Sequence, residues 1–372
     1  MHFDAPMTEL KATRPARAPT QQAIADYCQV ARSTVATVLS PRRTTAVVKP
    51  ETRRRVLQAV KQLGYRPHHS ARTLRLGTPR ALAVAMAQQN LDHAYVALRV
   101  LDGIRMEAGR TDFSLILCQF VGPNDVQAVQ HQVRESRFDG VFLFNPVDSD
   151  HDPRREALEQ INVPAVLIEA HAGGAALDFD NVGGAREAVE HLVRHGRRRI
   201  AFLGNGVMRP FLRDRLRGYE QALADHGLEV DPALIRNTPS AWAEVGTIAV
   251  GQLLDQGIPF DALFCAADDA ALNAIQALSA RGLRVPEDVA IVGVGDSYMG
   301  RLANPPLTSV RLDGVELGRR AMRMMLDLVA GRPAPREAVF VPAPLVVRRS
   351  SAAVAPQTSQ IPGFDESKGD TT

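Results

Sequence analysis

The stretch that decides the fold of the first part of the chain reads Thr20-Gln-Gln-Ala-Ile-Ala-Asp-Tyr-Cys-Gln-Val-Ala-Arg-Ser-Thr-Val-Ala-Thr-Val-Leu39. Its apolar residues recur at spacings that place them on one face of two short helices. Thr20 is a suitable N-cap for the first helix, and the short turn at residues 29–31 holds the second helix across the first. The pattern predicts a helix-turn-helix, the arrangement in which the second helix enters the major groove of DNA.

A third helix is predicted directly after this pair. It opens at Pro50, whose fixed φ suits a first helical position, and stops at Gly64. Its expected buried stripe comprises Val56, Leu57, Val60 and Leu63. Residues 19–65 are thus predicted to form a small all-α domain, although paired short helices also occur in proteins that never bind DNA.

The charge of the chain is unevenly distributed. Residues 1–79 contain 14 Lys and Arg against 4 Asp and Glu, whereas the rest of the chain contains 30 against 37. A basic head is the electrostatic footprint of a nucleic-acid binder, because Lys and Arg displace the counterions condensed on phosphates. A disordered basic tail without a partner is the alternative for residues 1–18, but it does not explain the periodic segment that follows.

Length and composition exclude several classes of protein. A chain of 372 residues is expected to form two or three folding units. No apolar run approaches the length needed to cross a bilayer, and residues 1–19 lack the apolar core of a signal peptide, so the protein is predicted to be cytoplasmic and associated with the nucleoid. Cys28, Cys118 and Cys265 lie in apolar sequence and read as reduced core thiols, with no metal site and no cofactor.

Beyond residue 79 the sequence alternates between strands and helices. A helix is expected over residues 94–110, and continuous apolar runs predict strands at 81–86, 114–118, 140–144, 163–168, 200–204, 262–265 and 289–294. Such alternation predicts parallel, doubly wound sheets, and the length of the region suggests two Rossmann-like lobes. Ligands bind at the carboxyl ends of such strands, so two facing lobes are expected to enclose a binding cleft.

The segment between head and body carries the most specific motif. Gly64-Tyr-Arg-Pro67 runs into Ala71-Arg-Thr-Leu-Arg75 and then Gly77, and here the chain resembles the lactose/galactose-repressor (LacI/GalR) family. The resemblance implies that residues 66–79 form a hinge helix that folds on operator DNA and pairs with its dimer mate. Leu74 then corresponds to a leucine that enters the minor groove, where unstacking costs a few kcal/mol and bends the duplex.

The resemblance extends over roughly residues 20–348. It rests on Asp180-Asn181 with Gly184, Arg215-Leu-Arg-Gly-Tyr219, Ala267-Asp-Asp269, Arg281-Gly-Leu-Arg-Val-Pro-Glu-Asp288 and Pro306-Leu-Thr-Ser-Val310. It implies an effector-binding and dimerisation body of the periplasmic-binding-protein type at 80–348. Lobe 1 is expected at about 80–179 and 314–338, and lobe 2 at about 181–310. The tail, 349–372, is expected to be disordered.

The resemblance also implies a set of DNA contacts. Arg32, Ser33 and Thr37 correspond to base-reading positions, and Thr34 corresponds to a phosphate contact. The full predicted set is Thr20, Arg32, Ser33, Thr34, Thr37, Arg72 and Leu74. Alanines stand at positions 31 and 36, where the family usually has serines that bind phosphates, so Arg42, Arg43 and the hinge arginines are expected to contribute more. Each of these side chains is otherwise an ordinary exposed helix residue.

A second set is implied for an effector in the cleft: Glu169, Phe179, Arg215, Trp242, Asp268 and Asp296. Carboxylates accept hydroxyl hydrogens, a guanidinium donates in a fork, and an indole packs on the C–H face of a sugar. Trp242 lies in a polar, loop-like segment, yet an isolated Trp is more often core, and Arg215 also reads as a solvated charge. Many family members have two consecutive acids where this chain has Gly295 and Asp296, which puts contact by Asp296 in doubt.

Enzyme motifs are missing from the sequence. There are no paired zinc-binding histidines, no Cys-x-x-Cys, no phosphate loop and no Gly-x-Ser-x-Gly, so the chain is predicted not to be an enzyme. The prediction is a dimeric transcription repressor whose affinity for a pseudo-palindromic operator is controlled by a sugar or sugar acid. A sugar-binding protein of the periplasmic type without DNA activity is the alternative. Effector identity, inducer or corepressor action, operator sequence, and dimer or tetramer stay open.

Overall fold

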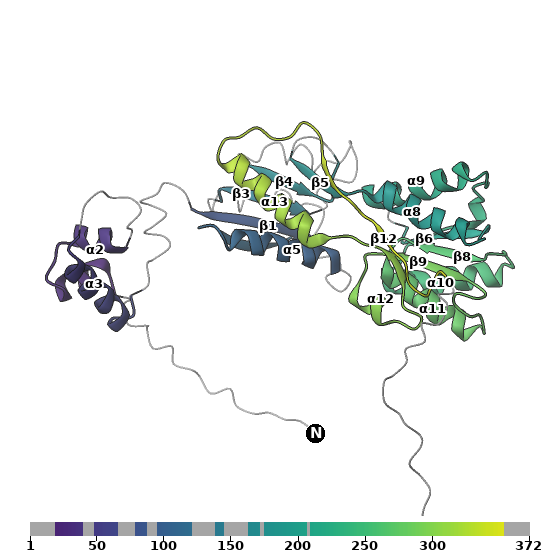
Figure 1. Cartoon of the computed structure of the whole chain (residues 1–372), viewed down its shortest axis with the longest axis horizontal. Helices are drawn as coiled ribbons and strands as arrows, with labels where there is room; N and C mark the ends of the chain where they lie inside the picture. Colours follow the sequence, from purple (N-terminus) through teal and green to yellow (C-terminus); the bar gives the residue numbers. More distant parts are fainter. Residues whose placement is uncertain are drawn as a thin grey trace, which may run out of the picture. The chain divides into compact units, whose positions relative to one another are not determined.

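The computed structural model describes residues 19–39, 48–65, 79–87, 95–120, 138–144, 163–171, 175–206 and 209–352 (Figure 1). The chain separates into two units between Pro79 and Arg80. The predicted hinge residues Arg72 and Leu74, the basic residues Arg42 and Arg43, and residues 1–18 and 353–372 lie outside the described residues.

The head is built from three helices, α1 (Gln21–Tyr27), α2 (Arg32–Leu39) and α3 (Pro50–Gln62). The Thr20 hydroxyl caps α1 by accepting a hydrogen bond from the Ala23 N–H at 3.2 Å, as the sequence predicts. The core of the head comprises Ile24, Ala25, Cys28, Val35, Val38, Val56, Ala59 and Tyr65. The predicted stripe of α3 is wrong at Leu57, which is 48% exposed, because Ala59 faces the core in its place.

Lobe 1 of the body contains a six-stranded parallel sheet in the order β11-β5-β4-β3-β1-β2. Its strands are β1 (Ala81–Ala87), β2 (Ser114–Phe120), β3 (Gly140–Phe144), β4 (Ala165–Ile168), β5 (Ala176–Phe179) and β11 (Val339–Val341). Helices α5 (Tyr95–Ala108) and α13 (Gly314–Val329) pack closely together. Glycine allows this approach, because a Cβ on Gly318 would lie 2.0 Å from the Val100 carbonyl oxygen.

Lobe 2 contains a second six-stranded sheet, in the order β12-β10-β9-β8-β6-β7. Its strands are β6 (Ile200–Gly204), β7 (Ile235–Asn237), β8 (Ala262–Cys265), β9 (Ala290–Val294), β10 (Thr308–Val310) and β12 (Leu345–Val346). All pairings are parallel except that of β12 with β10. The sheet is doubly wound, with helices on both faces, as the sequence predicts.

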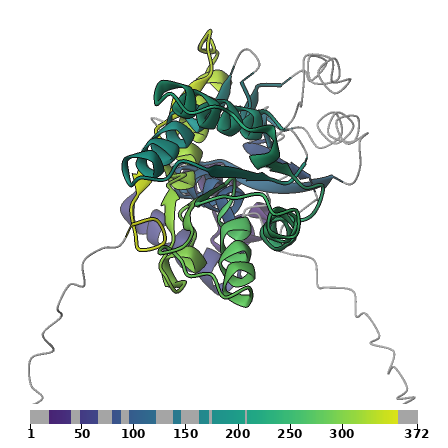
Figure 2. The ribbon, with the colours of Figure 1, turned by 90° about the vertical axis from the view of Figure 1, so that its right-hand side faces the viewer.

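The described part of lobe 2 contains five helices, four of which pack in two pairs. They are α8 (Asn181–Arg194), α9 (Pro210–Asp225), α10 (Trp242–Asp255), α11 (Asp268–Ala280) and the short α12 (Tyr298–Leu302), with a 3-10 turn, η3 (Pro232–Leu234), before β7. Residues of α8 and α9 belong to one core cluster, and residues of α10 and α11 belong to another. Figure 2, which looks along the long axis, shows the teal α8 and α9 apart from the green α11 and α12.

The chain passes between the two sheets three times. It crosses after β5 into α8, after β10 into α13, and after β11 into β12. The last pass carries the body beyond residue 348, where the sequence placed its end. Ser350 and Ser351 are buried, and the Ser350 hydroxyl donates to the Ile291 carbonyl oxygen at 2.7 Å. The predicted disordered tail at 349–372 is therefore wrong for its first residues.

No helix in the described part of the chain is both long enough and apolar enough to cross a membrane.

Candidate functional site

The exposed face of α2 carries the predicted DNA-contacting residues. Val35 and Val38 turn into the core of the head, which leaves Arg32 and Ser33 exposed at the start of the helix and Thr37 half-buried one turn later. The Thr37 hydroxyl donates to the Ser33 carbonyl oxygen at 2.9 Å, which holds its side chain along the helix. This face has the position and side chains of a recognition helix.

In the body, Arg215 on α9 is buried, and its guanidinium is held by hydrogen bonds to two other segments of lobe 2. Its Nε donates to Asn181 Oδ1 at 2.9 Å, and its Nη1 donates to the Ala266 carbonyl oxygen at 2.7 Å. The guanidinium also lies over the Phe211 ring, 4.8 Å from its centroid. Burial lowers the pKa of Arg215 to about 10, so the group stays charged at neutral pH. The interpretation of Arg215 as a solvated helix charge is wrong.

Carboxylates surround this cation. The electrostatic field of Glu169 opposes the effect of burial on the pKa of Arg215, followed by the fields of Asp178, Asp268 and Asp214. Glu169 and Asp268 were predicted from the sequence, and the structure brings both toward Arg215. Glu169 follows β4 with φ of 57°, a left-handed conformation that costs about 1 kcal/mol or more outside glycine and is frequent at functional sites.

Asp268 is the first residue of α11, at the carboxyl end of β8, and it is buried. Its Oδ1 accepts from the Ser309 hydroxyl at 2.6 Å, and its Oδ2 accepts from the Ser297 N–H at 2.6 Å. Burial raises the pKa of Asp268, and these hydrogen bonds oppose that effect. The carboxylate therefore fixes the loop after β9, and its charge acts on Arg215.

Asp296 has a different environment from the other candidates. Its Oδ2 lies 2.8 Å from Arg311 Nε, and its Oδ1 lies 2.5 Å from Arg348 Nη2 and 3.4 Å from Arg301 Nε. The carboxylate is 2% exposed and is committed to three guanidinium groups. This arrangement favours a structural role for Asp296 and agrees with the doubt that Gly295 raised in the sequence.

Trp242 and Phe179 are both packed into cores. Trp242 is the first residue of α10 and not part of a loop, and it packs half-buried against two core clusters, one shared by both lobes and one within lobe 2. Phe179 ends β5, is 1% exposed and lines a cavity at the crossover between the lobes. The indole at the start of α10 and the phenyl ring at the end of β5 both have faces that suit a sugar. Most of the surface of each ring is nevertheless packed against the core and stabilises the fold.

Two residues that lie close to the candidate site, Asn181 and His171, were not singled out from the sequence. Asn181 stands in a quoted motif, Asp180-Asn181, yet its contact with Arg215 depends on how α8 and α9 pack. His171 follows Glu169 by two residues and carried no motif of its own. Its Nε2 lies 2.6 Å from Asp178 and 3.3 Å from Asp214.

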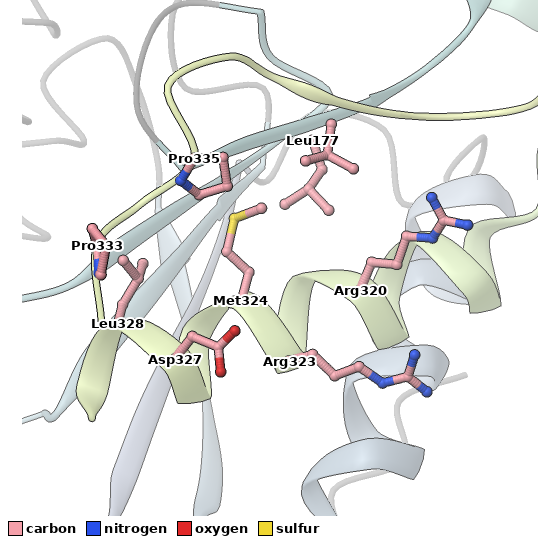
Figure 3. Close-up of a pocket in the computed structure, with 9 residues that line it drawn as sticks. Leu177, Arg320, Arg323, Met324, Asp327, Leu328, Pro333 and Pro335 are labelled. Atoms are coloured by element: carbon pink, nitrogen blue, oxygen red, sulfur yellow. The ribbon is translucent and has the colours of Figure 1, made fainter. Parts of the chain in front are cut away.

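Described residues line cavities at two places in the body. The first, of about 570 Å³, lies at the crossover and is lined by His171, Phe179, Asp180, Asn181, Val182, Asp214, Arg217, Gln221, Phe340 and Pro342. The second, of about 280 Å³, belongs to lobe 1 alone (Figure 3). Met324 of α13 projects into it beside Leu177 and Pro335. The first cavity is lined by residues of both lobes, and of the predicted effector residues it includes Phe179.

Metal and thiol chemistry have no support in the part of the chain that the structure describes. No group of three His, Cys, Asp or Glu side chains there is arranged to hold a metal ion. Cys28, Cys118 and Cys265 are buried free thiols.

Comparison with known proteins decides the family. The family model "Bacterial regulatory proteins, lacI family" matches residues 20–68, and the model "Periplasmic binding protein-like domain" matches residues 189–351. The HTH-type transcriptional regulator CelR of Thermobifida fusca is 32% identical over 341 residues, which cover 90% of this chain and 98% of CelR. The chain belongs to the LacI family. The match of the head counts against a sugar-binding protein without DNA activity.

Other LacI-family members match over most of their length. The HTH-type transcriptional repressor CytR of Escherichia coli is 28% identical, with 93% of this chain and 100% of CytR covered. The crystal structure of the lac repressor dimer bound to operator and the anti-inducer ONPF has a TM-score of 0.80 and 27% identity, covering 91% of this chain and 100% of that one. The predicted helix-turn-helix head, two-lobed α/β body and regulatory, non-enzymatic function are confirmed.

Proposed function

We propose that this LacI-family regulator is a homodimeric repressor that binds pseudo-palindromic operator DNA, and that a sugar or sugar acid held between its lobes controls operator affinity. The observation that carries the proposal is Arg215, a buried guanidinium facing Glu169 and Asp268 where the two lobes meet. A buried cation among carboxylates offers both donors and acceptors, which a polyhydroxyl ligand requires.

Solved relatives support the ligand class. The complex of the transcriptional regulator CelR with cellobiose has a TM-score of 0.67 and 30% identity, with 89% of this chain and 99% of CelR covered. We extend a carbohydrate ligand to this chain because Glu169, Arg215 and Asp268 supply hydrogen-bonding groups and Trp242 supplies an aromatic face. Phe179 completes the proposed site. Asp296 supports the site indirectly, through its ion pairs with Arg311 and Arg348.

We assign operator recognition to α2 and the hinge. Arg32 and Ser33 contact base edges in the major groove, Thr34 contacts a phosphate, and Thr37 lies on the same face. Thr20 caps α1 and keeps its own hydroxyl hydrogen available for a phosphate. Arg72 and Leu74 act in the minor groove at the centre of the operator.

We assign dimerisation to the apolar surface of the body. Tyr298, Met299 and Leu302 on α12 are 63%, 63% and 64% exposed, and Ile116 and Leu117 are exposed on the edge strand β2. Exposed clusters of large apolar side chains mark interfaces, and a two-fold dimer reads a two-fold operator. Operator binding places the protein in the cytoplasm, on the nucleoid.

A thermal-shift screen against sugars, sugar acids and sugar phosphates tests the proposal. A ligand present at about 100 times its Kd stabilises the fold by about 2.7 kcal/mol. We expect a member of these classes to raise the melting temperature and to change operator affinity in the same sample. Operator affinity that is identical with and without every stabilising ligand would contradict the proposal.

A further inference from the structure

His171 lies at the boundary between the lobes, in the loop after β4. Its Nε2 is 2.6 Å from Asp178 Oδ2 on β5 and 3.3 Å from Asp214 Oδ2 on α9. Lobe 1 supplies His171 and Asp178, and lobe 2 supplies Asp214. A single nitrogen atom therefore joins carboxylates of both lobes.

A continuous chain of hydrogen bonds leads from His171 to Arg215. Asp178 Oδ1 accepts from Asn181 Nδ2 at 3.3 Å, and Asn181 Oδ1 accepts from Arg215 Nε at 2.9 Å. Asp178 is 0% exposed and Asn181 is 3% exposed, so bulk water does not compete for these bonds. A change at His171 reaches the guanidinium through only two intervening side chains.

The charges around His171 come from three elements. Asp178 faces it from β5, Asp214 and Arg217 face it from α9, and Asp180 at the start of α8 lines the same cavity. Strand β11 contributes Phe340, whose ring meets the imidazole edge-on at 5.5 Å between centroids. Arg217 is tied to Asp214 at 3.0 Å. Among the described residues that line this cavity, the side chains other than Arg217 are carboxylates or uncharged.

This environment favours the imidazolium form. The hydrogen bond to Asp178 raises the pKa of His171 above its ordinary value of 6.5, and burial opposes this. The imidazole is 31% exposed and lines the crossover cavity, so it exchanges protons with solvent while Asp178 behind it does not. The His171 imidazole therefore holds its proton to higher pH than a free histidine does.

We propose that His171 is a proton-sensitive positioning residue, whose protonated form holds Asp214 of lobe 2 against Asp178 of lobe 1 and steadies Arg215 through Asn181. Loss of the proton leaves two carboxylates facing one neutral donor, and their repulsion favours separation of the lobes. Each unit by which the His171 pKa differs between two lobe arrangements changes their ratio about tenfold. The consequence for the effector rests on the proposed function, because there Arg215 contacts the effector.

Energy transfer between dyes on the two lobes tests this without effector or DNA. One dye is attached at Arg110→Cys in lobe 1 and the other at Ser279→Cys in lobe 2, both exposed positions, while the three native cysteines are buried. Labelled chains are mixed with excess unlabelled protein, so that each dimer carries at most one labelled protomer. Transfer is then measured from about pH 5.5 to about pH 9, which spans the titration of histidine.

In the parent protein we expect one sigmoidal change in transfer with a midpoint above 6.5. His171→Gln, which keeps a donor to Asp178 but cannot be protonated, should give a flat profile. Asp214→Asn, which leaves the buried bond to Asp178 intact, should lower the midpoint and the amplitude. The variant His226→Gln, at the end of α9, should give the same transfer profile as the parent, because His226 Nδ1 hydrogen-bonds to the Ala222 carbonyl oxygen of its own helix.

A flat parent profile, or His171→Gln titrating like the parent, would overturn the inference. If His171→Gln fails to fold, the Asp214→Asn profile decides, since an unchanged midpoint there is equally contradictory. None of these outcomes touches the proposed function, which the ligand screen and operator binding test at a single pH. Failure of that screen would likewise leave the lobe titration unaffected.

Discussion

Arg215 of α9 donates from Nη1 to the carbonyl oxygen of Ala266 at 2.7 Å, which ties a helix of lobe 2 to the carboxyl end of strand β8. Ala266 directly precedes the Ala267-Asp268 pair that opens α11. The bond therefore fixes a cation beside a buried carboxylate before any ligand arrives, and such preorganisation lowers the entropy lost on binding.

Arg215→Ala should abolish the response to the effector. The substitution removes the guanidinium and leaves Asn181 Oδ1 and the Ala266 carbonyl oxygen without their donor, at a cost of about 1–3 kcal/mol in stability. Thermal shift with the sugars that stabilise the parent is the measurement. Arg194→Ala, which removes an exposed arginine of the same lobe, is the matched control and should keep the full response.

The operator affinity of Arg215→Ala separates two modes of action. If the effector is an inducer, the free variant should bind operator like the parent. If the effector is a corepressor, the variant should never bind operator tightly. A parent-like effector response in Arg215→Ala would contradict the assigned role.

Arg32→Ala should relax base preference at one position in each half-site. A good contact to a base edge contributes about 1–3 kcal/mol of discrimination, so the variant should lose this against the parent operator and tolerate substitution at that position. Gel-shift titrations against single-base operator variants measure this. Equal weakening on all operators would instead make Arg32 a phosphate contact.

Operator affinity should fall steeply with salt concentration. Each neutralised phosphate contributes a slope of about −0.9 in a log–log plot, and the head carries many cations. We expect a slope steeper than about −3 for the dimer. Fluorescence anisotropy across a range of salt concentrations measures it, and a shallower slope contradicts the proposed binding mode.

Leu74→Ala should reduce the bend in operator DNA and the specific affinity while leaving the head folded. An apolar wedge between base steps kinks the duplex, and alanine is too short to unstack them. Electrophoresis of complexes with circularly permuted operators reports the bend. Equal bending by the parent and the variant would show that Leu74 does not bend the operator.

Gly318→Ala should destabilise the body by about 1–3 kcal/mol, the range for overpacking a core. A Cβ there would lie 2.0 Å from the backbone oxygen of Val100. Because the clashing atom belongs to the backbone, a rotation of a side chain cannot relieve the clash. Gly251→Ala is the matched control: it lies inside α10 with nothing within 4 Å of the added Cβ, so it should stabilise by up to about 1 kcal/mol. Calorimetric melting of both variants measures the difference, and equal melting temperatures would contradict the packing argument.

The sequence predicts the strands with continuous apolar runs well and the shortest strands poorly. Strands β3, β6 and β8 have the expected bounds because each is a continuous apolar run buried on both faces. Strand β7 (Ile235–Asn237) includes Arg236 and Asn237, and β11 and β12 pair with strands far away in the sequence. Such strands exist because of their neighbours, so local pattern does not reveal them.

Some residues of the candidate site could also be predicted from the sequence, and others could not. Arg215, Glu169 and Asp268 were found because they stand in or beside family motifs or at strand ends. The partners that hold Arg215 are an amide from α8 and a backbone carbonyl after β8, and no motif encodes a backbone carbonyl. Trp242 was misplaced because Pro239 and Ser240 give the start of α10 the composition of a loop.

The three passages between the sheets have a consequence for synthesis. Strand β11 of lobe 1 is translated only after nearly all of lobe 2, and β12 of lobe 2 follows last. Domains fold in order as they leave the ribosome, so the head can fold early. Neither lobe can complete its sheet until the final segment has been made. Between the synthesis of β10 (Thr308–Val310) and that of β11 and β12, both sheets therefore lack their last edge strand, and β5 and β10 expose unpaired backbone groups that chaperones can bind.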